Sequence, residues 1–433
     1  MNPRSPKSRI GSLLSITAAL AVAGCDCGGA PEGVIDSCES ELALPPSVST
    51  DILFVIDNSR SMREEQEKVV AELHTFVASL VGGPVKNDFQ IGVVTTGISQ
   101  YSTTCDGQFT DLIDFTRESG RLQRGLLPMS ESQILSSSEL EVMGEAWLDK
   151  VKLLLDLGVD GSGQEMGLEA ARRALSEPLL STSPLADPPG NQGFLRPGSR
   201  LLVVILSDED DCSVPGSKTL AVEPTCGEDC TADSDCGGEG RYCVPKDSTD
   251  LAKGRACSDN ACEIPEGRAR LVPVSTYVDF LQGLDDGTGQ GRKREVFLAV
   301  VGAVDESSLA PARCHTENDE AYGAAVRYAQ TVEAMGERGL IESICQADYG
   351  VSLRRIAELV SAPQTIELPQ SPPDGHLLVI ELQRASGETV LCKMGAGFDF
   401  EPATAAARAR ATLRGACRLR NGDRVVLKIA CAG

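Results

Sequence analysis

The sequence predicts an α/β protein with a doubly wound, mostly parallel sheet flanked by helices, a Cys-rich insertion and a small C-terminal β module. Short apolar runs rich in β-branched residues alternate with amphipathic segments of helical period, which is typical of a parallel sheet covered on both faces. Seven cysteines between Asp211 and Pro265 lie in a segment with almost no apolar periodicity. After about residue 363 the pattern changes to short alternating strands.

The first strand of the α/β body is expected from Asp51 to Asp57. Its sequence, Asp-Ile-Leu-Phe-Val-Ile-Asp, is apolar throughout between the two acids, as expected for a central strand buried on both faces. The next segment, about 62–81, has apolar residues at helical spacing, and Gly82-Gly83-Pro84 ends it. Further strands are expected at 89–95, 200–206 and 295–301, and further helices at 133–155, 164–176, 273–283, 319–336 and 348–361.

Composition excludes some classes of function. The 433 residues include 63 Asp and Glu against 40 Lys and Arg, a formal charge of −23, which disfavours a protein that binds nucleic acid. Sixteen cysteines indicate an oxidising compartment in which disulfides persist. The chain has three histidines and no Gly-x-Ser-x-Gly motif, so we expect no catalytic residues and no enzymatic activity.

The N-terminal segment has the pattern of an export signal. Three basic residues precede an apolar stretch over 10–23, which has the length of a signal-peptide core and is too short to span a bilayer. The stretch ends in Val22-Ala23-Gly24-Cys25, which resembles the bacterial lipobox, in which the cysteine becomes lipidated. We therefore expect a signal peptide over 1–24, lipid on Cys25, and an exported protein anchored in the cell envelope. An ordinary signal peptide, with Cys25 in a disulfide, is the alternative.

The rest of the chain divides into three parts. Residues 25–48 are rich in Gly, Pro and Ser and predict a flexible tether. Residues 49–362 form the α/β domain, interrupted by a disulfide-stapled insertion over 212–265, for which export favours disulfides over zinc. Residues 363–433 predict a small β domain, in which Asn421-Gly422 is the expected turn of a hairpin.

Short oxygen-bearing side chains follow two of the predicted strands. Asp57, Ser59 and Ser61 alternate where the first strand gives way to a helix, and Asp208 follows the 200–206 strand. If the two strands are neighbours, these side chains meet at the carboxyl edge of the sheet, where open α/β folds bind ligands. Hydroxyl and carboxylate oxygens suit a hard cation such as Mg²⁺. Taken alone, such a turn is a helix N-cap.

The pattern Asp57-x-Ser59-x-Ser61, together with Asp208 after a later strand, resembles the von Willebrand factor A (vWA) domain and its metal-ion-dependent adhesion site. The resemblance extends over about 50–362, and the run Leu206-Ser207-Asp208-Glu209-Asp210-Asp211-Cys212 is similar to exported bacterial proteins of this class, often lipoproteins. It implies a vWA/Rossmann-like fold and a divalent cation, Mg²⁺ or else Ca²⁺ or Mn²⁺, at those four residues.

The sequence departs from the family pattern in two places. Glu209 follows Asp208 where the family has glycine, which adds charge beside the site. The family expects a threonine in the loop before a helix, and the matching loop offers Ser162 or Glu165. A carboxylate at Glu165 would bind the ion more strongly and reduce its attraction for a partner's acid. Helix capping is the alternative role for both.

The resemblance implies a binding function. We expect the bound cation to capture an acidic side chain of a protein or surface ligand, so that the chain acts in adhesion, with no nucleic acid and with membrane contact only through its lipid. One alternative is a metal-dependent hydrolase that uses two ions and four acids, Asp57, Asp208, Asp210 and Asp211. Another is a purely structural envelope protein.

Overall fold

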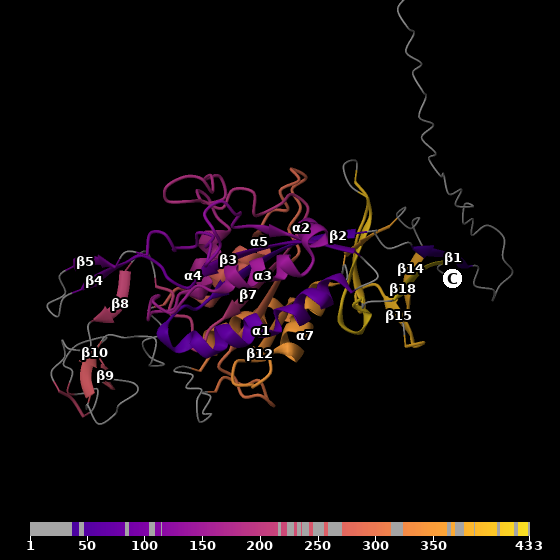
Figure 1. Ribbon diagram of the computed structural model, residues 1–433. Coiled ribbons are helices and arrows are strands. Elements are labelled where there is room, and N and C mark those ends of the chain that lie inside the picture. Colours follow the sequence, from indigo (N-terminus) through magenta and orange to yellow (C-terminus); the bar gives the residue numbers. More distant parts are fainter. Residues whose placement is uncertain are drawn as a thin grey trace, which may run out of the picture.

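The computed structural model describes a large part of the chain (Figure 1). The described residues are 37–42, 47–82, 86–103, 109–113, 115–214, 218–222, 229–231, 235, 242–245, 255–258, 271–312, 324–361, 365–368, 376–384, 386–404, 408–419 and 423–431. The expected signal peptide, Cys25 and most of the expected Cys-rich insertion lie outside these residues.

A six-stranded, mostly parallel sheet forms the centre of the α/β part. Its strand order is β12-β11-β7-β2-β3-β6, and only the β3–β6 pair is antiparallel. Four of its strands coincide with the predicted ones, whereas the short β6 and β12 were not expected. The strands are β2 (Ser47–Ile56), β3 (Lys86–Thr95), β6 (Leu135–Ser136), β7 (Arg200–Leu206), β11 (Val296–Gly302) and β12 (Gly339–Ser343).

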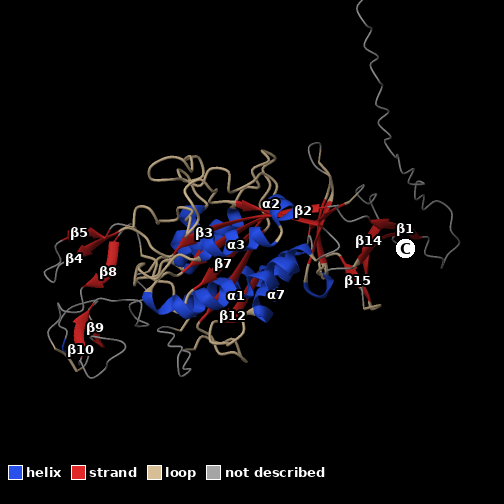
Figure 2. Cartoon of the chain, viewed as in Figure 1, coloured by secondary structure: helices blue, strands red, loops and turns tan. Residues whose placement is uncertain are grey.

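Helices flank this sheet (Figure 2). Helix α1 contacts α3 and α7, while α5 contacts both α4 and α6. The crossover from β2 to β3 runs in the opposite direction from the crossovers β7 to β11 and β11 to β12, so right-handed connections place their helices on opposite faces. The fold is therefore of the α/β class. The helices are α1 (Arg63–Val81), α3 (Glu145–Leu155), α4 (Gly167–Ala174), α5 (Val274–Gly283), α6 (Val326–Met335) and α7 (Gly350–Ser361).

One predicted helix is divided. The segment expected to be helical over 133–155 contains β6, then α2 (Ser137–Met143), and then α3. Ser136 and Glu139 form a capping box that begins α2. Gly144, with φ of +58°, separates α2 from α3, because a left-handed residue cannot continue a right-handed helix.

The core of the α/β part is built on β2. Ile52, Leu53 and Val55 are fully buried, as the continuous apolar run predicts. The Phe54 ring packs edge-on against Phe76 of α1, with 5.6 Å between ring centroids. Helix α1 therefore covers one face of the central strand, and its N-terminal end lies next to the turn that follows β2.

A buried ion pair holds the amino ends of β2 and β7 together. Asp51 in β2 is 0% exposed, and the Arg196 Nε donates to its Oδ1 at 2.6 Å. The backbone N–H of Arg196 donates to the other oxygen at 2.8 Å. Because Arg196 lies four residues before β7, this contact fixes where the loop enters the sheet. Burial raises the pKa of Asp51, while Ser199 and Arg196 act in the opposite direction.

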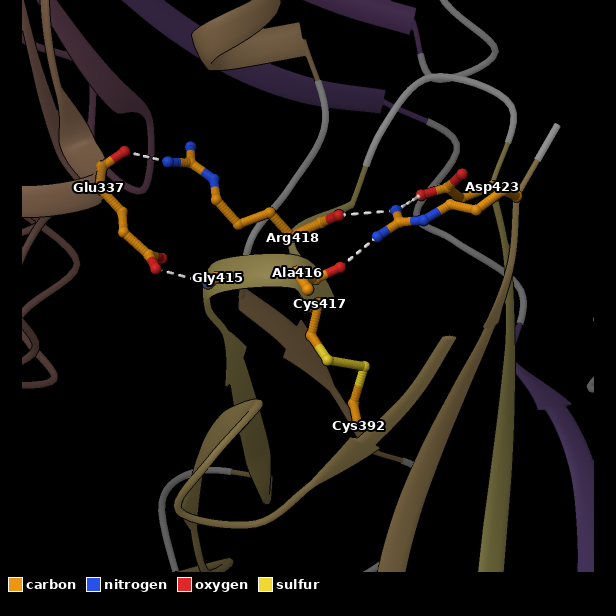
Figure 3. Close-up of a disulfide and its surroundings, with 8 residues drawn as sticks. Glu337, Cys392, Gly415, Ala416, Cys417, Arg418 and Asp423 are labelled. Carbon is orange, nitrogen blue, oxygen red and sulfur yellow. Dashed lines mark hydrogen bonds and ion pairs between the residues drawn. A yellow bond between two sulfur atoms is a disulfide. The ribbon is translucent and has the colours of Figure 1, made fainter. Parts of the chain in front are cut away.

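The C-terminal part has two antiparallel sheets and a separate apolar core. One sheet has the order β1-β18-β14-β15 and the other β13-β17-β16. The Cys392–Cys417 disulfide joins β15 to the short helix that follows β17 (Figure 3). The strands are β1 (Ser37–Leu42), β13 (Thr365–Glu367), β14 (His376–Gln383), β15 (Thr389–Lys393), β16 (Phe398–Glu401), β17 (Arg410–Leu413) and β18 (Arg424–Cys431).

Two features of this module differ from expectation. β1 falls inside the segment expected to be a tether, yet it pairs antiparallel with β18 and forms one edge of the four-stranded sheet. The turn expected at Asn421-Gly422 lies outside the described residues, and the strand that follows it, β18, pairs with β1 and β14 rather than with β17. Val425 and Leu427 are buried in the same core as Ile380 and Leu382 of β14, so side-chain burial decided the pairing.

The C-terminal module contacts the α/β part near Glu337 (Figure 3). The Gly415 N–H donates to Glu337 Oε1 at 2.5 Å, and Arg418 donates to the Glu337 carbonyl. Arg384 pairs with buried Asp423 and donates to the carbonyls of Ala416 and Arg418, so the contacting segment is fixed from both sides.

Two smaller β units complete the described elements. The first has the order β5-β4-β8 and the second pairs β9 with β10. Among the described residues, no helix is both long and apolar enough to cross a membrane. The strands are β4 (Gln100–Thr103), β5 (Phe109–Ile113), β8 (Lys218–Val222), β9 (Tyr242–Pro245) and β10 (Arg255–Ser258).

Replacing Arg196 with Met is expected to lower the free energy of unfolding by about 3 kcal/mol, because it leaves the buried Asp51 carboxylate without its closest cation. Urea unfolding followed by circular dichroism measures this change. The matched control is Arg117→Met, since Arg117 is 73% exposed and pairs with an exposed Asp187. That change should cost less than about 1 kcal/mol. Equal losses in the two variants would contradict the role given to the Arg196–Asp51 pair.

Candidate metal centre

The carboxyl ends of β2 and β7 lie side by side, as the sequence argument requires. The strands are parallel with Ile56 opposite Leu206, and the Asp57 N–H donates to the Leu206 carbonyl at 2.9 Å. The chain leaves β2 toward β3 on one side, whereas β7 lies on the other, so the two strands flank a topological switch point. Ligands of open α/β sheets bind at such points.

Asp57 is the central residue of this edge. It is 0% exposed, and both of its carboxylate oxygens accept hydrogen bonds. The Ser59 N–H donates to Oδ1 at 2.8 Å, and the Ser207 hydroxyl donates to Oδ2 at 2.7 Å. Gln66 in α1 donates to the Asp57 carbonyl at 3.0 Å. Asp57 therefore ties the turn after β2 to the residue that follows β7.

Ser59 and Ser61 connect the two strand ends through their hydroxyls. Their Oγ atoms are 3.0 Å apart, and the Ser61 side chain hydrogen-bonds to Asp208. Asp208 itself is 3% exposed. Oxygens from the 57–61 turn and from the segment after β7 therefore converge, although about 150 residues separate them in the sequence.

Glu165 reaches the same cluster from the loop before α4. Its side chain is buried, with the residue 1% exposed, and it faces the carboxylates of Glu209, Asp57 and Asp208. The Gly161 N–H in this loop donates to the Asn58 carbonyl at 2.8 Å. A Cβ at Gly161 would lie 2.1 Å from Asn58 Oδ1, so glycine permits the loop to approach the turn this closely.

Ser162, the rival to Glu165 in this loop, is engaged locally. Its hydroxyl donates to the Gln164 carbonyl at 3.0 Å and accepts from the Gln164 N–H at 3.1 Å. These contacts close a turn of the kind that serine side chains commonly form. The hydroxyl of Ser162 therefore supports the loop that carries Glu165.

The electrostatics of the cluster disfavour ionised carboxylates. Burial, reinforced by Asp57 and Glu209, raises the pKa of Asp208 to about 9. Burial is also the main cause that raises the pKa of Glu165 well above its ordinary value, followed by Glu209 and Asp57. The pKa of Asp57 is raised by burial, against the hydrogen bonds from Ser207 and Ser59. Several acids thus share a buried space with little cationic compensation.

Two buried oxygens in the cluster remain unsatisfied. Asp208 Oδ1 and Glu165 Oε1 have no hydrogen-bond partner among the described residues. Buried carboxylate oxygens normally have a partner, because leaving them without one is costly. A divalent cation would satisfy these oxygens and offset the mutual repulsion, so the residues present fit the ion that the sequence pattern implies.

The donors are mixed in type. In the described part of the chain, no group of three or more His, Cys, Asp or Glu side chains is arranged to hold a metal. The set at this edge instead combines the hydroxyls of Ser59 and Ser61 with carboxylates. Such a set suits Mg²⁺, which binds through few carboxylates and retains several water molecules.

The other two acids after β7 support helices. Asp211 accepts from the Leu168 N–H at 3.0 Å, in the first turn of α4, and from the guanidinium of Arg327 at 3.0 Å. Asp210 accepts from the Arg327 N–H at 2.8 Å, in the first turn of α6. Carboxylates are favourable at helix N-termini, where backbone N–H groups lack partners. The side chains of Asp210 and Asp211 therefore cap helices.

Thr96 was not singled out from the sequence, although it also lies at this edge. It follows β3, is fully buried, and its hydroxyl has no hydrogen-bond partner within the described residues. Its N–H donates to the Ile56 carbonyl at 3.3 Å, and its carbonyl accepts from Met166 at 3.2 Å. Its position directly after a predicted strand is the signal that would have indicated it.

Comparisons with known proteins do not assign a family. No family model matches the sequence, and no curated protein matches it. Among solved structures, the pilus adhesin SpaC from Lactobacillus rhamnosus GG aligns with a TM-score of 0.32 and 10% identity, covering 91% of this chain and 40% of that one. The pilus adhesin RrgA from Streptococcus pneumoniae aligns at 0.33 and 10%, covering 91% and 58%.

The human COPII-coat protein Sec24c has a similar score, 0.34 at 10% identity, with 91% of this chain and 41% of that chain covered. The chain thus spans less than two thirds of each of these proteins. Similarities at this level establish neither a shared activity nor a shared ligand.

The stability of the cation-free protein is expected to fall as pH rises from about 4 to about 9. Over this range the folded state keeps a proton on Asp208 that the unfolded chain releases, and the raised pKa of Glu165 acts in the same direction. The unfolded state therefore binds fewer protons, and the free energy of unfolding decreases with pH. Each retained proton contributes a slope of about 1.4 kcal/mol per pH unit. Urea unfolding in the presence of chelator, at about pH 5 and about pH 8, measures this pH dependence.

Asp208→Asn should reduce this slope, because it removes one of the titrating groups. The control is Asp149→Asn, since Asp149 is exposed on α3 and lies outside the cluster. An unchanged slope in Asp208→Asn would show that the cluster does not hold these protons.

Proposed function

We propose that the α/β part is a vWA-like binding module that holds a divalent cation, Mg²⁺ or else Ca²⁺ or Mn²⁺, at the carboxyl ends of β2 and β7. The single observation that carries the proposal is the meeting of the Ser59 and Ser61 hydroxyls with Asp208 across the switch point, beside two unsatisfied carboxylate oxygens. The α/β topology and the sequence pattern at this edge support the same conclusion.

Each residue has a distinct role in the proposed site. Ser59, Ser61 and Asp208 supply the hydroxyl and carboxylate oxygens. Asp57, whose two oxygens both accept hydrogen bonds, fixes the turn and adds negative charge. When bound, the cation offers a Lewis-acidic position that an acidic side chain of a partner can complete. The chain's own residues bind and orient, which is the chemistry of recognition rather than of catalysis.

Glu165 is the proposed ligand from the third loop, in preference to Ser162. It is buried against Asp57 and Asp208 and has an unsatisfied oxygen, whereas the Ser162 hydroxyl is engaged with Gln164. A carboxylate here, with Glu209 beside it, leaves the site more negative than a threonine would. The site should therefore bind its cation tightly. Because the added negative charge repels a partner's acidic side chain, the partner should need further contacts with this protein to bind.

The helix-capping contacts of Asp210 and Asp211 favour binding over the two-ion hydrolase. That alternative requires four acids around two cations about 4 Å apart. Asp211 instead pairs with Arg327, and Asp210 caps α6. We therefore propose a protein that is not an enzyme.

The arrangement of the chain suits display from a surface. β1 pairs in the C-terminal module, which adjoins the amino edge of the sheet, while the proposed cation site lies at the opposite, carboxyl edge. If Cys25 carries lipid, the chain between it and Ser37 spans at most about 40 Å. The C-terminal module would then face the membrane of the cell envelope, and the cation site would face outward toward a protein or surface ligand.

Calorimetry with Mg²⁺ tests the cation site. The wild-type protein should bind the ion at a stoichiometry of about one, and Asp57→Asn should weaken binding at least about tenfold, because it removes a charge while keeping the side chain's shape. Asp149→Asn serves as the control and should bind like the wild type. Equal heats in Asp57→Asn and the wild type would refute the site.

Partner capture tests the binding function. Surface proteins bearing acidic peptides should be retained by the wild type with Mg²⁺ and released by chelator, whereas Asp57→Asn should retain none. Glu165→Thr should bind Mg²⁺ more weakly yet capture the partner more strongly per bound ion, since less negative charge surrounds the cation. Capture that is insensitive to chelator would contradict the proposal.

Cell fractionation tests the anchor. The wild-type protein should sediment with membranes and partition into detergent, whereas Cys25→Ala should appear in the soluble exported fraction, because the lipid would supply its membrane affinity. Cys38→Ala is the matched control and should remain with the membranes. Membrane association that persists in Cys25→Ala would exclude lipidation as the anchor.

A further inference from the structure

A cleft of about 610 Å³ lies between the α/β part and the C-terminal module. It adjoins the amino ends of β11 and β12, because Glu295 and Arg338, which immediately precede these strands, line it. The C-terminal module supplies the other wall, from β13, β16, β17 and the residues on either side of the short helix Gly415–Cys417. The volume is within the range of small-molecule sites.

The cleft has the opposite charge to the chain as a whole. Seven arginines and lysines line it against four acids, a net charge of +3 when all are ionised, whereas the whole protein carries −23. Arg292, Lys293 and Arg410 also line an adjoining hollow of about 510 Å³, so the basic surface extends further along the joint. Concentrating positive charge here runs against the composition of the protein, and such clefts attract anions.

Carboxylates neutralise several of these cations only in part. Lys293 donates to the Gly283 carbonyl at 2.6 Å. Arg418 donates to the Glu337 carbonyl, and the carboxylates of Glu337 and Glu295 offset part of its charge. Arg292 lies 4.0 Å from Glu367, at the limit of an ion pair. Arg414 pairs with Asp399 at 2.7 Å but has a half-exposed side chain, and a guanidinium has five donors.

The wall residues come from both parts of the molecule. Arg338 precedes β12, while Arg410 and Arg414 begin and follow β17. The contacts of Glu337 with Gly415 and Arg418 fix the two walls of the cleft relative to each other (Figure 3). A ligand here would touch both parts at once.

We propose that this cleft binds a small hydrophilic ligand that carries two or more carboxylate or phosphate groups. Arginine suits such oxyanions, because its planar fork donates two parallel hydrogen bonds to them. The site is separate from the proposed cation site. The seven residues of β11 separate the amino edge from the carboxyl edge by about 20 Å. The inference therefore does not depend on the proposed function.

Titration calorimetry tests the proposal with citrate and pyrophosphate as probes. The full-length protein is first stripped of divalent cations and dialysed into chelator-free buffer of low ionic strength. The wild type should bind at least one probe at one site. Arg338→Gln with Arg414→Gln should weaken binding at least about tenfold. The matched control, Arg117→Gln with Arg354→Gln, removes the same charge from exposed positions outside the cleft and should change the dissociation constant less than about twofold.

Glu401→Gln supplies a test of opposite sign. Glu401 is an exposed acid that lines the cleft, so its neutralisation should tighten probe binding about twofold. A purely structural role of the surrounding residues would not produce tighter binding. Asp57→Asn should bind the probes like the wild type, which separates failure of this site from failure of the cation site.

Sedimentation with vesicles identifies the source of the anion. Vesicles with phosphatidylglycerol that retain the wild type but not the Arg338→Gln, Arg414→Gln variant would indicate a lipid headgroup. Binding of soluble probes without vesicle binding would indicate a free anion. No heat with either probe, together with no vesicle retention, would overturn the proposal. Binding by the cleft variant equal to that of the wild type would overturn it too.

Discussion

The parallel pairing of β2 with β7 is the constraint on which the candidate site depends. The Asp57 N–H continues the ladder to the Leu206 carbonyl, and the Asp57 carboxylate accepts from the Ser207 hydroxyl one residue further on. The two strands also meet at their other ends, through Asp51 and Arg196. With the register held at both edges, the 57–61 turn and Asp208 have no freedom to separate, and their oxygens face one another.

That juxtaposition concentrates negative charge in a buried space. Desolvation raises the pKa of Asp57, Asp208 and Glu165, and each carboxylate opposes ionisation of the next. Such an arrangement weakens the fold unless a proton or a cation occupies it. Structural acids elsewhere in the molecule differ, since Asp51 and Asp211 face arginines. The contrast is that the acids of the carboxyl edge lie together with little cationic compensation, which is the observation that favours the proposed cation site.

The two edges of the sheet carry side chains of opposite charge. Acids gather at the carboxyl edge, and arginines gather where the C-terminal module meets the amino edge. The module itself is held by its own apolar core and by a disulfide, so it presents Arg410 and Arg414 from a fixed framework. The two proposed binding sites thus lie about one strand length apart, and each is placed where the sheet meets a segment from a distant part of the sequence.

The sequence by itself determined the α/β class, the central strand that ends at Asp57, the hydroxyl spacing of Ser59 and Ser61, and an acid, Asp208, after the 200–206 strand. These features follow from local periodicity and from residue type. Only the tertiary structure decided that β2 and β7 are neighbours, that Glu165 is buried beside Asp208 while Asp211 pairs with Arg327, and that β18 pairs with β14 rather than with β17. Burial, pairing and charge interactions depend on residues far apart in the chain, and no local pattern records which of them will meet.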